Sequence, residues 1–234
     1  VVGHRAMSLA IDYELFSQVA YEVPFNGNTA INGGWYGEAD NTIAKISKDC
    51  GCPWYQGADI KRAKALLAEA GYPNGFAAVM EYGYANQTPW RELLASFWKE
   101  IGVTVQIKLL DYTVYRANLD KGTWTDMTWS FIFPYASSMY GTMSQYVPGR
   151  GGNSNSGWIN DPKLTALITE FDASYKNHAR QLELVKQARA YYLDQVYNIP
   201  DARGTTFTVF TPRLRNWQPS TNLLLSSSQQ LNIT

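Results

Sequence analysis

Residues 58–76 read ADIKRAKALLAEAGYPNGF, and this stretch says more about the fold than any other part of the chain. Asp59 stands where a helix N-cap belongs, because its side chain can accept a hydrogen bond from a backbone N–H of the first turn. An apolar stripe at helical spacing follows, formed by Ile60, Ala63, Leu66, Leu67 and Ala70. Gly71 can take the left-handed conformation that ends a helix, and Pro73 and Gly75 then turn the chain. The stretch predicts an amphipathic helix that packs on a sheet.

Helices and strands alternate along the rest of the chain. Further helices are predicted at 1–11, 12–19, 88–101, 112–120, 162–175 and 177–197, and strands at 76–84, 103–109, 127–133 and 205–210. Asp12, Asp111 and Asp161 stand at N-cap positions, and Thr88 and Pro89 fit the N-cap and first turn of their helix. Residues 21–57 are rich in Gly, Asn and Pro and are predicted to form a long loop. This order predicts an α/β fold whose mixed or mostly parallel sheet is flanked by helices.

The charge of the chain is balanced, with 20 Lys plus Arg and 20 Asp plus Glu. Attraction to nucleic acid or to an anionic membrane is therefore not expected, and no nucleic-acid partner is predicted. No apolar run is long enough to cross a bilayer. Aromatic residues make up 14% of the chain, which favours surfaces that receive a ligand, although most single rings are expected in the core.

Cys50 and Cys52 are the only two cysteines, and one residue separates them. A local disulfide and two buried thiols are both compatible with the sequence. His4 and His178 lie far from the cysteines and at no ligand spacing, so neither a metal nor another cofactor is expected.

The sequence gives little support to catalysis. No two carboxylates stand out as an acid and base pair for glycoside hydrolysis, and no Gly-x-Ser-x-Gly motif is present. The glycine-rich run at 149–157 lacks the Gly-Lys-Ser/Thr ending of a phosphate loop and is interpreted as a polar connection. The protein is therefore not expected to be an enzyme.

Three motifs besides the 58–76 helix carry a resemblance to a known family. They are AID at 10–12, WKEIGVTV at 98–105 and NDPKL at 160–164. In this order the four segments resemble the extracellular solute-binding proteins of family 5, which includes the oligopeptide- and dipeptide-binding proteins of bacterial ABC importers. The resemblance covers residues 5–200. It implies a periplasmic-binding-protein-like fold of class II, in which two lobes close around one solute.

The same resemblance implies how the chain is organised and where it works. Family members are considerably longer and begin with a signal peptide or lipoprotein leader. Residues 1–215 are therefore expected to form the C-terminal lobe, and residues 216–234 to return to an N-terminal lobe that this chain lacks. The expected function is solute capture for an ABC importer, with permease subunits as partners, outside the cell or in the periplasm, and with a lipoprotein tether. The aromatic content motivates one alternative, a carbohydrate-active enzyme or a lectin-like carbohydrate-binding module.

The segment WSFIFPYASSMY at 129–140 is the first candidate for ligand binding. In peptide-binding members of the family, an acid a few residues after this Trp pairs with the amino group of the ligand. Residues 130–135 contain no acid, and a buried ammonium needs such a partner, so a peptide held by its amine is disfavoured. An oligosaccharide that stacks on aromatic rings is favoured over a peptide-like solute. The predicted ligand-binding residues are Trp129, Phe133, Tyr135, Tyr140, Asn153, Asn155, Trp35 and Tyr84.

Overall fold

The computed structural model describes residues 1–22, 47–48, 50–129 and 158–199 of the chain. The chain divides into two compact units, Val1–Arg203 and Gly204–Thr234, and every described residue belongs to the first. The predicted strand at 205–210, the tail at 216–234 and most of the predicted 21–57 loop lie outside the described residues.

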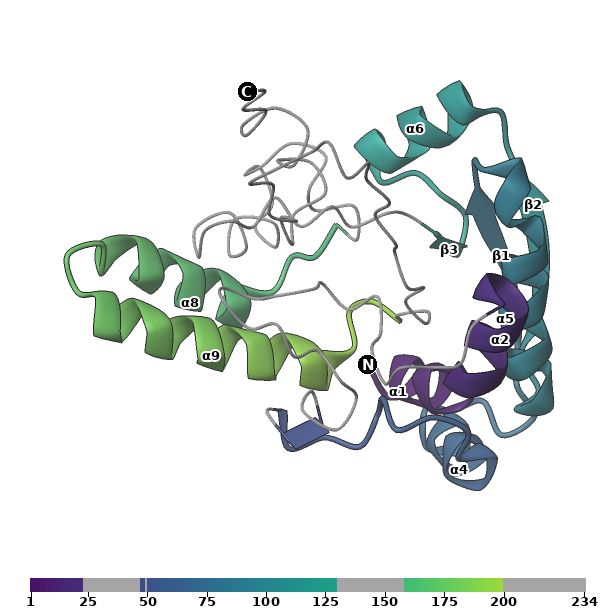
Figure 1. Cartoon of the computed structure of the whole chain (residues 1–234), viewed down its shortest axis with the longest axis horizontal. Coiled ribbons are helices and arrows are strands. Elements are labelled where there is room, and N and C mark those ends of the chain that lie inside the picture. The colour runs from purple at the N-terminus through teal and green to yellow at the C-terminus, as the bar shows by residue number, and fades with distance from the viewer. Residues whose placement is uncertain (23–46, 49, 130–157, 200–234) are drawn as a thin grey trace, which may run out of the picture. The chain divides into compact units, whose positions relative to one another are not determined.

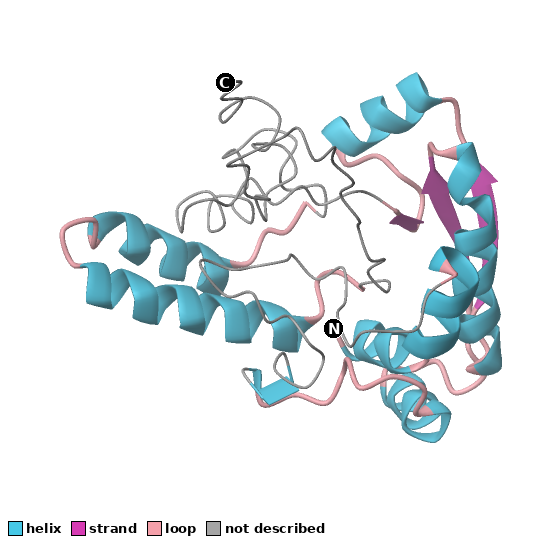
Figure 2. Cartoon of the chain, viewed as in Figure 1, coloured by secondary structure: helices cyan, strands magenta, loops and turns pink. Residues whose placement is uncertain are grey.

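A parallel sheet with helices beside it lies at one side of the described structure (Figure 2). Its strands are β1 (Ala77–Tyr82), β2 (Thr104–Leu109) and β3 (Met127–Thr128), in the order β2-β1-β3. The β1 and β2 strands pair from Ala77 opposite Thr104 to Tyr82 opposite Leu109, and β3 pairs with the other side of β1. Parallel neighbours need a crossover connection, and α5 supplies it between β1 and β2. The α/β class with helices flanking the sheet is confirmed.

The helices predicted for the described part of the chain are all present (Figure 1). They are α1 (Val2–Leu9), α2 (Tyr13–Tyr21), α4 (Ile60–Glu69), α5 (Thr88–Glu100), α6 (Tyr112–Lys121), α8 (Pro162–Ala173) and α9 (His178–Gln195). The predicted aspartate caps form, because the side chains of Asp12, Asp59, Asp111 and Asp161 each accept a backbone N–H of the first turn. Local sequence therefore determines where these helices begin.

The start of α5 differs from the prediction. Its N-cap is Gln87 and not Thr88, because a 3₁₀ turn, η1 (Ala85–Gln87), leads directly into the helix. The Thr88 hydroxyl does not cap α5. Its Oγ1 instead donates to the Ala85 carbonyl at 2.8 Å and lies 2.6 Å from the Tyr82 hydroxyl.

Helix α4 ends as its sequence predicts. Gly71 has a φ of 91°, and its N–H donates to the Ala68 carbonyl, while the Tyr72 N–H donates to the Leu67 carbonyl. This pair of bonds is a Schellman motif, which satisfies carbonyls that the end of the helix leaves open. The buried face of α4 packs mainly against α1 and shares a core with Met80 of β1.

Buried side chains form two clusters in the described residues. One joins the sheet to α1, α2, α4 and α5, and the other lies between the antiparallel helices α8 and α9 (Figure 1). Cys52 belongs to the second cluster and forms a disulfide with Cys50, which decides between the two alternatives left open by the sequence.

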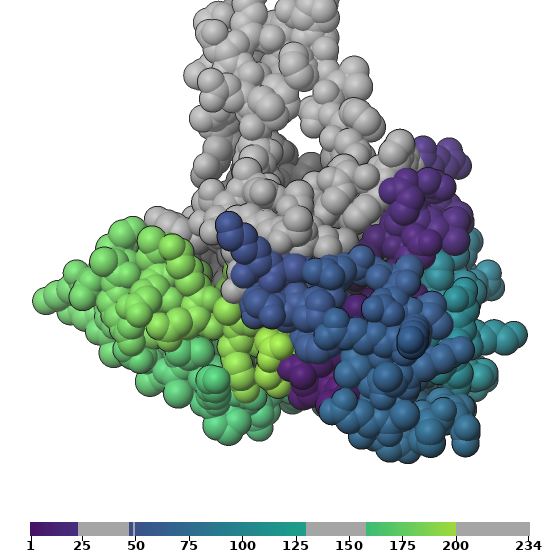
Figure 3. All heavy atoms as spheres, turned by 90° about the horizontal axis from the view of Figure 1, so that it is seen from below, coloured from purple at the N-terminus to yellow at the C-terminus, as the bar shows by residue number. Residues whose placement is uncertain are grey.

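Polar contacts connect the end of α9 to the N-terminal part of the chain. Tyr55 donates its hydroxyl to the Leu193 carbonyl at 2.7 Å, and the Trp54 indole donates to the Asp194 carboxylate at 3.0 Å. The other oxygen of Asp194 pairs with the Arg5 guanidinium of α1 at 2.8 Å. On the face in Figure 3, the segment after Cys50 accordingly lies between the end of α9 and α4.

Candidate functional site

The carboxyl ends of the three strands lie at one edge of the sheet, because the strands are parallel. In open α/β sheets this edge is where ligands bind. Tyr84 follows β1 by two residues, Trp129 follows β3 directly, and α6 begins with Tyr112 shortly after β2. Three separate strand ends therefore bring aromatic residues to the same edge.

These residues form an aromatic cluster, defined as Tyr84, Tyr112, Tyr115 and Trp129. The ring of Tyr84 makes T-shaped contacts with the other three, at centroid distances of 5.5 Å to Tyr112, 5.8 Å to Tyr115 and 5.9 Å to Trp129. Edge-to-face geometry of this kind is the arrangement that aromatic rings prefer. Tyr115 is buried, Tyr84 and Trp129 are half-buried, and Tyr112 is 51% exposed. The aromatic cluster thus has a packed base and an accessible side.

Tyrosine hydroxyls in the aromatic cluster are held by hydrogen bonds. Tyr115 donates its hydroxyl to the Trp129 carbonyl at 2.7 Å. Burial raises the pKa of Tyr115, and the neighbouring Tyr84 raises it further. Burial also raises the pKa of Tyr84, together with a hydrogen bond to Tyr112. Both phenols therefore remain neutral hydrogen-bonding groups.

Arg91 of α5 contacts the same cluster from the core. Its side chain is fully buried, and its guanidinium carbon lies 4.1 Å from the centroid of the Trp129 ring. This is a cation–π contact away from water, where such contacts are strongest. The sequence did carry a signal for this residue, because Arg91 is a charged member of the buried α5 stripe that continues with Leu94 and Trp98.

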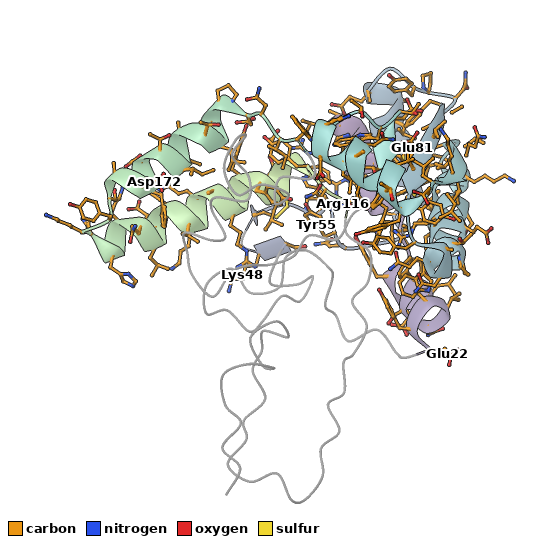
Figure 4. All side chains as sticks on the ribbon, turned by 90° about the horizontal axis from the view of Figure 1, so that it is seen from above. Glu22, Lys48, Tyr55, Glu81, Arg116 and Asp172 are labelled. Atoms are coloured by element: carbon orange, nitrogen blue, oxygen red, sulfur yellow. A yellow bond between two sulfur atoms is a disulfide. The ribbon has the colours of Figure 1, made fainter. Side chains whose placement is uncertain are left out.

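Glu81 is a buried carboxylate at the centre of the sheet (Figure 4). Thr125 and Lys108 donate to its Oε1 at 2.9 and 3.3 Å, and Asn118 donates to Oε2 at 3.1 Å. Burial alone raises the pKa of Glu81, but the hydrogen bonds from these three side chains outweigh it and hold the pKa below its usual value. The carboxylate connects β1 to β2, to α6 and to the approach to β3, so its role is structural.

The structure describes two of the eight predicted ligand-binding residues, Tyr84 and Trp129, and brings them into contact. The remaining six lie outside the described residues: Trp35, Phe133, Tyr135, Tyr140, Asn153 and Asn155. Tyr112 and Tyr115 are not among the predicted ligand-binding residues, because their sequence context indicates only that both belong to a helix. Their spacing of three residues places them on one face of α6, which was the available signal.

Helix α6 forms hydrogen bonds with Trp129 and Trp158, the two residues on either side of segment 130–157. Trp129 accepts the Tyr115 hydroxyl, and on the other side the Trp158 indole donates to the Leu119 carbonyl at 2.8 Å. Trp158 also packs against Gly122, where an added Cβ would lie 2.8 Å from the indole ring. The position of α6 therefore determines where the chain leaves the described site and where it returns.

The described part of the chain offers neither a candidate metal site nor a candidate membrane span. No group of three or more His, Cys, Asp or Glu side chains there could hold a metal ion. Among the helices of these residues, none combines the length and the apolar character needed to cross a membrane.

The chain matches a known protein family. The profile of the bacterial extracellular solute-binding proteins, family 5 Middle, matches residues 4–157. The chain is 30% identical over 172 residues to heme-binding protein A of Haemophilus influenzae, an alignment that covers 69% of this chain and 30% of the relative. It is 27% identical over 158 residues to the dipeptide-binding protein of Escherichia coli, covering 64% of this chain and 29% of the relative. The matched region is thus under a third of either relative's length.

Solved structures share the fold at lower identity. The PBP AgaA from A. tumefaciens R10, in complex with agropinic acid, matches 86% of this chain and 39% of its own, with a TM-score of 0.66 and 22% identity. A mannohexaose-bound periplasmic oligopeptide-binding protein from Thermotoga maritima matches 86% of this chain and 40% of its own, with a TM-score of 0.65 and 20% identity. The binding protein DppA from Helicobacter pylori, in complex with the peptide STSA, matches 85% and 37%, with a TM-score of 0.61 and 17% identity.

Proposed function

The chain belongs to the bacterial extracellular solute-binding proteins of family 5, and we propose that it captures a solute for an ABC importer. The observation that carries the proposal is the aromatic cluster at the carboxyl edge of the parallel sheet, to which three separate strand ends contribute. Ligands of open α/β folds bind at this edge, and aromatic rings supply large contact areas with few torsions to order. Tyr84, Tyr112 and Trp129 form the described part of the ligand surface in this proposal.

We propose that residues 1–215 are one lobe of a two-lobed protein and that residues 216–234 return to the other lobe. Support comes from the coverage of the solved structures, since the three above match 85–86% of this chain but only 37–40% of their own chains. Hinge closure of two lobes around the solute would then bring the missing half of the ligand contacts. An ABC permease and a lipoprotein tether complete the proposed assembly.

Calorimetric titration tests the lobe assignment. The 234-residue chain and the full-length protein are each titrated with the same solute. The chain alone is expected to bind far more weakly, because the contacts of the second lobe are absent. Equal affinities would contradict the assignment.

For the ligand, we propose an uncharged solute, with an oligosaccharide favoured over a peptide-like molecule. The aromatic cluster suits the apolar faces of sugar rings, and the nearby Glu81 carboxylate is already engaged by three donors and does not serve an incoming ammonium. The proposed contacts also include Phe133, Tyr135 and Tyr140, as well as Asn153, Asn155 and Trp35. The carbohydrate-active enzyme or lectin-like alternative receives no support from the relatives, which are binding proteins.

Native mass spectrometry of the full-length protein, purified without added solute, tests this proposal. A retained oligosaccharide is expected. A retained peptide with a free amino terminus would contradict the proposed ligand class. A retained nucleotide or metal would contradict the proposal that the site binds a solute for an importer of this family. If the protein is purified empty, thermal shifts with mannohexaose and with the peptide STSA replace the measurement, and a larger shift with the peptide contradicts the ligand class.

A further inference from the structure

Arg91 is the largest fully buried side chain among the described residues. Removing a guanidinium from water is costly, so a buried arginine needs contacts that repay its lost hydration. One of these contacts is the face of the Trp129 ring, 4.1 Å away. The neighbouring positions on the buried stripe of α5, Leu94 and Trp98, are filled by apolar core residues.

The backbone of Trp129 is fixed independently of its ring. Its N–H donates to the Glu81 carbonyl at 3.1 Å, and its carbonyl accepts the Tyr115 hydroxyl at 2.7 Å. These bonds fix the position of the Cα atom, but they leave the two side-chain torsions of the tryptophan free to choose among rotamers. The ring itself contacts Tyr84 and Arg91 and packs against the core beneath the sheet, and Arg91 is the cation among these contacts.

We propose that Arg91 is a positioning residue, whose guanidinium holds the Trp129 indole in the orientation in which the ring meets the solute. This inference rests on the proposed function, in which Trp129 contacts the ligand. A planar guanidinium can stack on an indole, and the buried setting strengthens the attraction. A ring that is already oriented loses less entropy when the solute binds, so the contact raises affinity without touching the ligand.

Fluorine NMR of the 234-residue chain labelled with 5-fluorotryptophan tests the inference without any ligand. The Trp129 resonance is assigned from its loss in Trp129→Phe. In Arg91→Met the Trp129 resonance is expected to move and to broaden, because the ring loses its cation and samples other rotamers. Arg91→Lys keeps a cation and is expected to restore part of the shift.

A matched control exists in the same chain. Arg62 lies over the Trp54 ring at 5.1 Å, on the exposed side of α4, so Arg62→Met also removes a cation–π contact. This variant is expected to affect the Trp54 resonance and to leave that of Trp129 in place. The Trp98 resonance reports on general loosening of α5, because its indole is buried and donates to the Met7 carbonyl.

Two results would overturn the inference. One is a Trp129 resonance that stays in place in Arg91→Met. The other is a Trp98 resonance that moves as far as that of Trp129, since this would mean that Arg91 only supports the packing of α5. If Arg91→Met does not fold, Arg91→Lys is the variant that tests the inference. A Trp129 resonance that keeps its position and width in Arg91→Lys then counts against it.

Addition of mannohexaose and of the peptide STSA separates this inference from the proposed function. A Trp129 resonance that responds to Arg91→Met and also to a solute supports both. In full-length protein that a thermal shift shows to bind one of these solutes, the Trp129 resonance can respond to Arg91→Met and yet to neither solute. The inference that Arg91 positions the ring would then stand. That result would refute the ligand role of Trp129.

Discussion

Replacing Glu81 with glutamine should destabilise the protein, because three side chains converge on a carboxylate that is only 4% exposed. The bonds from Thr125 and Asn118, at 2.9 and 3.1 Å, are hydrogen bonds to a charged acceptor. The pair with Lys108 contributes less, because the Lys108 side chain is 51% exposed and its charge is screened by solvent. A glutamine keeps one acceptor oxygen and the same shape, so we expect a loss of about 2 kcal/mol in unfolding free energy at pH 7.

The pH dependence of this loss follows from the direction of the pKa shift. Burial raises the pKa of Glu81, but the hydrogen bonds outweigh it, and the folded-state pKa lies below the ordinary value of 4.5. A carboxyl group with a lowered folded pKa stabilises the protein above its unfolded pKa, and this stabilisation is lost as the pH falls through the folded pKa. The difference between wild type and Glu81→Gln is therefore largest at neutral pH and narrows below pH 4.5.

Urea denaturation of both proteins, followed by circular dichroism between pH 7 and pH 3, measures this difference. Glu69→Gln is the matched control, because Glu69 is exposed on the last turn of α4, and we expect it to change stability by less than about 0.5 kcal/mol. The reasoning is refuted if Glu81→Gln is as stable as the wild type at pH 7, or if the difference stays constant as the pH falls.

Two further predictions concern the turn before β1 and the N-cap of α8. Gly75 has a φ of 77°, and a Cβ there would lie 1.9 Å from the Gly102 carbonyl oxygen, so Gly75→Ala should lower the melting temperature strongly. Gly71 has a φ of 91° and no atom within 4 Å of the added Cβ, so Gly71→Ala should cost only about 1 kcal/mol of unfolding free energy and lower the melting temperature less. Equal drops in melting temperature for the two variants would refute the steric argument. Asp161→Asn should lower the unfolding free energy measured by urea denaturation by about 2 kcal/mol, because the hydroxyls of Tyr197 and Tyr191 donate to one of the Asp161 oxygens at 2.7 and 2.9 Å. An unchanged denaturation midpoint would show that these bonds add nothing to stability.

The features that could be predicted from the sequence are those that depend on neighbouring residues. Asp12, Asp59 and Asp161 cap helices whose first turns follow directly, and Gly71 ends α4 through bonds within six residues. The N-cap of α5 was predicted one residue late, at Thr88, because the preceding 3₁₀ turn and the contact between Thr88 and the Tyr82 hydroxyl are not visible in local propensity.

The features that escaped prediction are those in which distant residues meet. Arg91 and Trp129 are separated by 38 positions, and only the fold brings the guanidinium over the indole. Glu81 likewise did not stand out among the carboxylates, because Lys108, Asn118 and Thr125 reach it from other elements. Tyr84 and Trp129, which the sequence predicts as ligand-binding residues, lie in contact at the carboxyl edge of the sheet, and aromatic residues at the ends of strands can be recognised without knowing their partners.

The most direct test of the account is calorimetric titration of full-length protein and its Trp129→Ala variant with the solute that co-purifies, or with mannohexaose if none does. The variant is expected to bind the solute about tenfold more weakly, because one stacking surface is lost. Tyr175→Ala is the control, because this ring is 69% exposed in the connection between α8 and α9, and its removal should leave affinity unchanged. A Trp129→Ala variant that folds and binds the solute as tightly as the wild type would contradict the claim that the aromatic cluster is part of the ligand site.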